Sequence, residues 1–146
     1  MASEQLVDDL LSLWRVLRRI SHPVQQGEIT PQQYWLLLQL WKHGPLSIGE
    51  LADAVGVSQS AATTACKRLE RAGLVTRERQ ASDERVVLVE LTEQGREQFE
   101  AWRRHRRDVL AHLLEPLGEG DRAELQRLIE QVLARAAEES FAGARG

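Results

Sequence analysis

The spacing of apolar residues predicts a long amphipathic helix near the start of the chain. Apolar side chains recur at intervals of three and four between Glu4 and about Ser21, as a helix with one buried face requires. The residue before a proline resists helical geometry, so His22-Pro23 should end this helix. The apolar face is broader than one packing partner would cover, and we therefore expect a second partner, such as another subunit. This face comprises Leu6, Val7, Leu10, Leu11, Leu13, Trp14, Leu17 and Ile20.

A second helix should begin at residues 30–33 and lie in the centre of the domain. The segment TPQQ supplies a Thr N-cap, a proline at the first helical position and a glutamine at the third. The residues that follow, YWLLLQLWKH, are apolar nearly all round, which is typical of a buried helix, and Gly-Pro at 44–45 should stop it. Trp35 and Trp41 are either core side chains or the lining of a pocket for an aromatic ligand.

Two short helices joined by a tight turn are predicted between Ser47 and Gly73. Ser47 and Glu50 have the spacing of a capping box for the first helix. Gly56 can supply the positive φ that a sharp turn needs, and Ser58 can cap the second helix. Gly73 suits the left-handed position just after that helix. The order of these signals predicts a helix-turn-helix element.

The second helix of this element has two faces of different chemistry. Its inward stripe is small and apolar, so the helix can lie close to its neighbour. Its outward face carries short hydrogen-bonding side chains followed by cations, which suits reading base edges in a major groove and holding phosphates. The alternative is a solvated face on an ordinary helical hairpin. The inward residues are Ala61, Ala62, Ala65, Cys66 and Leu69, and the candidates for DNA contact are Ser58, Gln59, Ser60, Thr63, Thr64, Lys67 and Arg68.

After Gly73 the apolar pattern changes from a helical to an alternating period. It predicts strands at 74–79 and 86–91, joined by the polar segment 80–85. A β-hairpin directly after a reading helix is a wing, and an arginine at its tip can enter a narrow minor groove. Exposed arginines on a hairpin can also simply keep an edge strand soluble. The clustering of Lys67, Arg68, Arg71, Arg77, Arg79 and Arg85 favours a phosphate-facing surface, and the wing candidates for DNA binding are Arg77, Arg79, Asp83 and Arg85.

Two further helices should follow the hairpin. Thr92 can cap the first, which is expected from Glu93 to about Leu114 and carries a run of four arginines that could touch DNA or pair with acids of a partner subunit. The last helix should begin within 118–121 and continue to about Glu139, before a frayed tail at 141–146. Its narrow apolar stripe suits a helical dimer interface. The arginines are Arg103, Arg104, Arg106 and Arg107, and the stripe consists of Leu125, Leu128, Ile129, Val132, Leu133 and Ala136.

Composition narrows the functional classes. The 146 residues include 19 Lys+Arg and 22 Asp+Glu, for a formal net charge of −3. Nucleic-acid binding would therefore depend on where the cations cluster rather than on overall charge. Cys66 is the only cysteine, so an internal disulfide is excluded. We expect the Cys66 side chain to act as a small buried hydrophobic group, and redox sensing by this thiol is a minor hypothesis. The first residues lack a signal-peptide pattern and no uncharged stretch approaches the roughly 20 residues of a membrane span, so we expect a soluble, cytoplasmic protein without membrane partners.

Catalytic and metal-binding patterns are missing from the sequence. It contains no G-x-S-x-G, P-loop or glycine-rich nucleotide fingerprint. His105 and His112 would be separated by about 10 Å along one helix, too far to share a zinc ion. We therefore expect neither an enzyme nor a cofactor or metal site.

The span from Ser47 to Thr92 resembles the winged helix-turn-helix of the MarR (multiple-antibiotic-resistance regulator) family of bacterial transcription factors. The resemblance rests on LADAVGVSQSAATTACKRLERAGLV and on the more specific wing pattern D-x-R-x-x-x-V-x-L-T, residues 83–92. It extends to the flanking helices and so implies a mainly α fold with a small β-hairpin wing. The implied parts are an N-terminal dimerisation helix (1–28), a winged helix-turn-helix DNA-binding domain (29–92) and C-terminal dimerisation helices (93–146).

The resemblance also implies how DNA is bound. It implies an obligate homodimer with interlocked terminal helices, whose two winged domains meet successive major grooves of double-stranded DNA. Arg85 would enter the minor groove, while Asp83 would hold the wing by pairing with a nearby arginine. The chain departs from the family at Lys67, where members often carry an acid. The Lys67 cation should strengthen contact with phosphate. Because no acid stands at this position, the residue that would pair with Arg68 is not identified.

These features favour a transcriptional regulator, expected to be a repressor that binds a palindromic operator as a homodimer. A small aromatic effector between the dimer helices and the reading domain is expected to lower DNA affinity by favouring a different spacing of the reading helices. Trp14, His22 and Trp35 are the candidate pocket residues. The alternatives are a helical protein–protein interaction module and a non-specific, nucleoid-type DNA binder.

Overall fold

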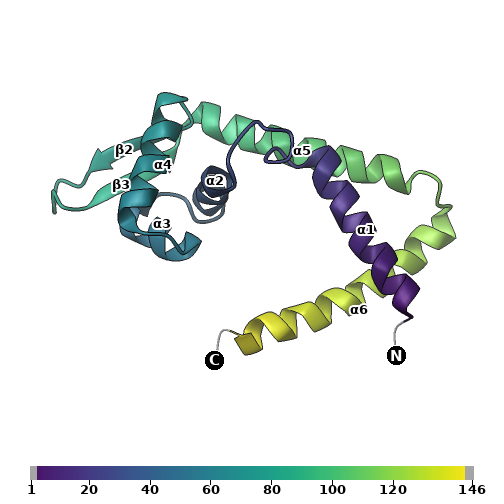
Figure 1. Cartoon of the computed structure of the whole chain (residues 1–146). Coiled ribbons are helices and arrows are strands. Elements are labelled where there is room, and N and C mark those ends of the chain that lie inside the picture. The colour runs from purple at the N-terminus through teal and green to yellow at the C-terminus, as the bar shows by residue number, and fades with distance from the viewer. Residues whose placement is uncertain (1–2, 144–146) are drawn as a thin grey trace. The chain divides into compact units, whose positions relative to one another are not determined.

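The computed structural model describes residues 3–143 and consists mainly of helices (Figure 1). Its residues form two compact units, the first ending at Val109 and the second beginning at Leu110. The three-part division expected from the sequence stays a prediction. The elements are α1 (Glu4–Ser21), α2 (Pro31–His43), β1 (Leu46–Ser47), α3 (Ile48–Val55), α4 (Gln59–Arg71), β2 (Val75–Arg79), β3 (Val87–Leu91), α5 (Glu93–Leu114) and α6 (Glu119–Gly143).

The predicted N-caps start the central helices. Thr30 Oγ1 accepts a hydrogen bond from Gln33 N at 3.2 Å, and Gln33 Oε1 accepts one from Thr30 N. Ser47 and Glu50 form the same reciprocal pair at α3, with distances of 3.1 and 3.2 Å. Ser58 Oγ accepts from the backbone N–H three residues further on, at 3.0 Å. These bonds satisfy N–H groups that have no partner within the helix, and so fix where α2, α3 and α4 begin.

Two glycines end α3 and α4 as predicted. Gly56 lies in the left-handed region with φ of 77° and turns the chain between the two helices. Gly73 has φ of 81° and donates its N–H to Glu70 O, while Leu74 N donates to Leu69 O, both at 2.9 Å. This pair of bonds is a Schellman motif, which closes the end of α4 and directs the chain into β2.

The sheet has three antiparallel strands in the order β1-β3-β2. The predicted hairpin is confirmed, with Val75 opposite Leu91 at its base and Arg79 opposite Val87 near its tip. The third strand, Leu46–Ser47, was not predicted from the sequence. Leu46 of this strand lies opposite Val89 of β3, and the pairing connects the start of α3 to the wing.

The core of the first unit lies between α2, the helix-turn-helix and the sheet. The expectation that α2 is a buried helix holds for Tyr34, Leu36, Leu37 and Leu40, but Trp35 has an exposed fraction of 51%. Trp41 is half-buried and packs on Phe99 of α5, with ring centroids 5.6 Å apart. The least exposed large side chains are Leu36, Leu37, Leu40, Leu51, Leu69, Val75, Val89 and Phe99.

Thr92 and Gly95 join the start of α5 to the end of α4. Thr92 Oγ1 donates to Gly73 O at 2.6 Å and accepts from Gly95 N at 2.9 Å, so the predicted N-cap is confirmed. Thr92 N also donates to Leu74 O at 3.0 Å. A Cβ at Gly95 would lie 2.0 Å from Leu74 O, which means that only glycine permits this approach of the two backbones.

The terminal helices each expose apolar side chains. In α1, Leu6, Leu10 and Trp14 are all about half exposed, and in α6, Val132 and Leu133 are more exposed still. Helix α6 runs to Gly143, four residues beyond its expected end at Glu139; the last three residues of the expected frayed tail lie outside the described residues. No helix within residues 3–143 has the length and apolar character needed to cross a membrane.

Candidate nucleic-acid interface

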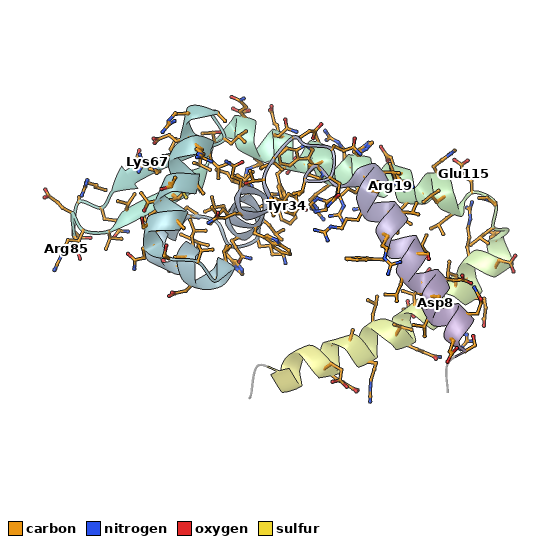
Figure 2. All side chains as sticks on the ribbon, in the orientation of Figure 1. Asp8, Arg19, Tyr34, Lys67, Arg85 and Glu115 are labelled. Carbon is orange, nitrogen blue, oxygen red and sulfur yellow. The ribbon has the colours of Figure 1, made fainter. Side chains whose placement is uncertain are left out.

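The predicted reading residues lie together on the outer side of α4. Ala62, Ala65, Cys66 and Leu69 are buried, as predicted, and Ala61 is half-buried. Of the seven candidates for DNA contact, Thr63 is half-buried, and the other six are exposed: Ser58, Gln59, Ser60, Thr64, Lys67 and Arg68. Figure 2 shows Lys67 on α4, beside the hairpin.

Two of these hydroxyls already have partners in the helix itself. Ser58 Oγ serves as the N-cap. Thr64 Oγ1 donates to Ser60 O at 3.0 Å, although the residue itself is exposed. The side chains of α4 with the greatest freedom to meet a ligand are therefore the other exposed candidates, which are Gln59, Ser60, Lys67 and Arg68.

The wing tip holds its own shape through Asp83. Asp83 Oδ1 accepts from Arg85 N at 3.0 Å and from Arg85 Nε at 3.4 Å, so the carboxylate braces the turn. Arg79 Nη1 donates to Glu84 O at 2.8 Å across the same turn. The Arg85 side chain remains 92% exposed and stands at the far end of the hairpin (Figure 2). Its pairing with Asp83 does not remove it from solvent, so it can reach an external anion.

Arg77 differs from the other wing candidates. Its Nη2 and Nε lie 3.1 and 3.3 Å from one oxygen of Glu70 on α4, and its side chain is only 23% exposed. This ion pair could not be predicted from the sequence, because Glu70 lies on a helix and Arg77 on the strand that follows the turn. The prediction that Arg77 contacts DNA stays a prediction.

Cys66 is buried in the core, close enough to Arg77 and Glu70 for their charges to act on its thiol. Burial raises the pKa of the Cys66 thiol to about 11, and nearby Arg77 and Glu70 act on it in opposite directions. A buried thiol with so high a pKa is almost wholly protonated near neutral pH, and thiolate is the reactive form. This environment favours the role of a small core hydrophobe over that of a redox sensor.

The three candidate pocket residues line one cavity in the first unit. Its volume is about 490 Å³, and it lies between α1, α2 and α5. The His22 and Tyr34 rings pack with centroids 4.4 Å apart. Figure 2 shows Tyr34 at the middle of the unit. The lining residues are Trp14, Leu17, Arg18, His22, Tyr34, Trp35, Leu38, Phe99, Arg103 and Arg106.

Arginines give this cavity a positive character that the sequence did not reveal. Arg106 Nη1 donates to Tyr34 Oη at 3.3 Å, and the Arg103 guanidinium lies 4.0 Å from the centre of the Trp41 ring. The sequence leaves a DNA-contacting, an intersubunit and a solvated role open for the arginine run of α5, and it does not predict that Arg103 and Arg106 line this cavity. Burial lowers the pKa of His22, and Arg106 and Arg18 lower it further, while its Nδ1 accepts from Val24 N. The cavity therefore combines an imidazole of lowered pKa with three arginine side chains.

No group of three potential ligand residues able to hold a metal ion occurs among residues 3–143. His112 lies 3.3 Å from Glu115 in the second unit. His105, in the first unit, is exposed on α5.

A helix-turn-helix followed directly by a hairpin, with cations on both, defines a winged-helix DNA-binding protein. Residues 29–87 match the profile of the MarR family. The chain is 32% identical over 142 residues to the HTH-type transcriptional repressor MdtR of Bacillus subtilis (strain 168), covering 94% of this chain and 91% of that protein. The chain belongs to the MarR family and is a DNA-binding transcriptional regulator.

Solved structures agree with this assignment. The YusO protein from Bacillus subtilis is 27% identical, with a TM-score of 0.78 over 92% of this chain and 99% of that one. The transcriptional regulator Tm0710 from Thermotoga maritima is 25% identical, with a TM-score of 0.76 over 96% of this chain and 99% of that one. The predicted fold class, mainly α with a small wing, is confirmed by these likenesses.

Proposed function

We propose that this protein is a homodimeric repressor that binds a palindromic operator and releases it when a small aromatic effector binds. The observation that carries the proposal is the joint display of polar and cationic side chains on α4 and of Arg85 at the wing tip. Both belong to one compact unit, so a single duplex can meet them together. The comparison with the repressor MdtR supports the direction of regulation.

Base reading is assigned to the first turns of α4. Gln59 and Ser60 are exposed near its N-terminus, where a reading helix approaches base edges in the major groove. Lys67 and Arg68, further along the same helix, would hold phosphates. Arg85 would enter the adjacent minor groove, where the negative potential is strongest in narrow, A·T-rich segments.

The homodimer is inferred from the apolar surfaces of the terminal helices. Helix α1 exposes a broad apolar face and α6 exposes an apolar stripe, and large exposed patches of this kind mark interaction surfaces. A second copy of the chain would cover both, and a twofold axis would explain a palindromic operator. The residues in question are Leu6, Val7, Leu10, Leu11, Leu13 and Trp14 in α1 and Leu128, Ile129, Val132 and Leu133 in α6.

The effector is assigned to the cavity lined by Trp14, His22 and Trp35. Its aromatic walls suit a planar ring, and Arg18 and Arg106 would favour a ligand that carries a negative charge. The cavity is bounded by α1, α2 and α5, so a ligand that prefers one arrangement of these helices would change the distance between the two reading helices. Such a ligand lowers the affinity for the operator only if it binds more tightly to the arrangement in which the reading helices do not match successive major grooves.

The test compares Arg85→Ala with Arg104→Ala. Arg104 is an exposed arginine of α5 to which the proposed function assigns no contact with DNA, so it serves as the charge-matched control. Each variant is titrated against a labelled duplex from upstream of its own gene and against random duplex of equal length, by fluorescence anisotropy. We expect Arg85→Ala to lose roughly tenfold in affinity for the upstream duplex, about 1.4 kcal/mol, with Arg104→Ala close to wild type. Equal affinity of the wild type for both duplexes would favour the nucleoid-type alternative. No binding to either duplex at low salt would favour a protein interaction module.

A further inference from the structure

The ion pair between Glu70 and Arg77 joins the reading helix to the wing. Glu70 lies in the last turn of α4 and Arg77 in the middle of β2, with the Schellman turn between them. Two of the three guanidinium nitrogens of Arg77, Nε and Nη2, donate to a single oxygen, Glu70 Oε1, at 3.3 and 3.1 Å. The pair therefore spans the turn that connects the reading helix to the wing.

The strand alternation of β2 explains why Arg77 faces the helix. Successive side chains of a strand point to opposite faces, so Val75 and Arg77 share one face and Glu78 lies on the other. Val75 is buried in the core, while Glu78 is exposed. Arg77 is held on the core side of the wing, at the edge of the packed interior.

This position makes Arg77 a poor phosphate ligand. Its side chain is 23% exposed, against 92% for Arg85, and its charge is already met by a carboxylate. A phosphate would have to displace Glu70, whose own charge would repel it. The pair is also partly open to water, and such pairs add little to global stability, so its role is sought elsewhere.

We propose that the Glu70–Arg77 pair sets the angle between α4 and the wing, so that Arg77 positions the DNA-contacting groups without binding phosphate itself. The proposal rests on the proposed function of α4 and Arg85 as the DNA-contacting parts. A fixed angle lets α4 lie in the major groove while Arg85 reaches the neighbouring minor groove. Without the pair, the hairpin can swing about its base, and the two contacts no longer form together.

The charge-swapped double variant Glu70→Arg/Arg77→Glu distinguishes positioning from direct contact. Its net charge equals that of the wild type. We expect Glu70→Gln and Arg77→Gln each to weaken binding to the upstream duplex about tenfold. The double swap should recover most of that loss, because it restores the ion pair with its charges exchanged and residues in contact are not additive in double-mutant cycles. Glu78→Gln, which removes a carboxylate from the opposite face of β2, is the matched control and should bind at least as well as the wild type.

Direct phosphate binding by Arg77 gives the opposite pattern. Removing Glu70 would then free Arg77, so Glu70→Gln would bind the upstream duplex more tightly. The double swap would bind more weakly than Arg77→Gln, because it places a carboxylate where a cation met the phosphate. Either result would overturn the proposal.

Amide hydrogen exchange of the free protein tests the same pair without DNA. We expect faster exchange in β2 and β3 of Glu70→Gln and Arg77→Gln, and wild-type exchange in the double swap and in Glu78→Gln. Unchanged hairpin exchange in both single variants would overturn the proposal. If the wild type binds neither duplex, the proposed function fails, while the exchange measurement still decides the role of the pair.

Discussion

Burial determines the reactivity of one residue, the thiol of Cys66. The sequence leaves open a core role and a redox role for this single thiol. In the structure it is fully buried on the inner stripe of α4, and its pKa is raised to about 11, chiefly by burial. The folded protein therefore holds the thiol proton more tightly than the unfolded chain does.

This difference predicts a loss of stability in alkali. The unfolded thiol titrates near pH 9 and the folded one near 11, so its contribution is complete below about pH 9 and is lost as the pH rises through 11. Between pH 7.5 and 10.5 the free energy of unfolding should fall by about 2 kcal/mol more in the wild type than in Cys66→Ala, by urea denaturation. Equal pH dependence of the two proteins would contradict the account. Rapid alkylation of native Cys66 at neutral pH would also contradict it.

At the scale of elements, the contact between α4 and α5 depends on the absence of a side chain. The Gly95 backbone packs on Leu74, and Thr92 bridges Gly73 and Gly95 with one hydroxyl. Helix α5 also contributes Phe99, Arg103 and Arg106 to the lining of the cavity proposed for the effector. A movement of α5 would therefore reach the end of the reading helix through this joint.

Substitution of Gly95 should disrupt this joint. A Cβ there would meet backbone atoms that cannot rotate away, so Gly95→Ala should cost about 1–3 kcal/mol and lower the melting temperature. Gly120→Ala in α6 is the control, because nothing lies within 4 Å of its Cβ position. The control should be neutral or gain up to about 1 kcal/mol. Similar melting temperatures for the two variants would show that the backbones can separate without cost.

Most elements could be predicted from the sequence because their signals are local. Ser47, Ser58 and Gly73 act through neighbours within a few residues, and each was placed correctly. Strand β1 was missed because two residues carry no periodicity. The pairing of Arg77 with Glu70 and the turn of Arg106 toward Tyr34 depend on how elements pack, which spacing along the chain does not encode.

At the scale of the whole molecule, the apolar surface of α6 is the strongest sign of a partner. Leu133 is 61% exposed, and Val132 and Ile129 are exposed on the same helix. The other side of α6 is polar and carries ion pairs such as Arg127–Glu124 at 2.6 Å. This division into two faces is what a helix in a subunit interface requires.

A charge on this stripe should break the dimer. Leu133→Glu would bury an unpaired carboxylate in the proposed interface, at a cost of roughly 3–5 kcal/mol. We expect sedimentation to show a shift toward monomer, with a parallel loss of operator binding. Gln131→Glu adds the same charge to a residue outside the apolar stripe and should remain dimeric. A dimeric Leu133→Glu protein would place the subunit interface elsewhere.

The proposed function requires that the protein recognise a specific DNA sequence. Its most direct test is the anisotropy titration of the wild type against the upstream duplex and random duplex over a series of salt concentrations. We expect tighter binding to the upstream duplex, with affinity that falls steeply as salt rises because phosphate contacts release counterions. Equal binding to both duplexes at every salt concentration, or no binding to either, would contradict it.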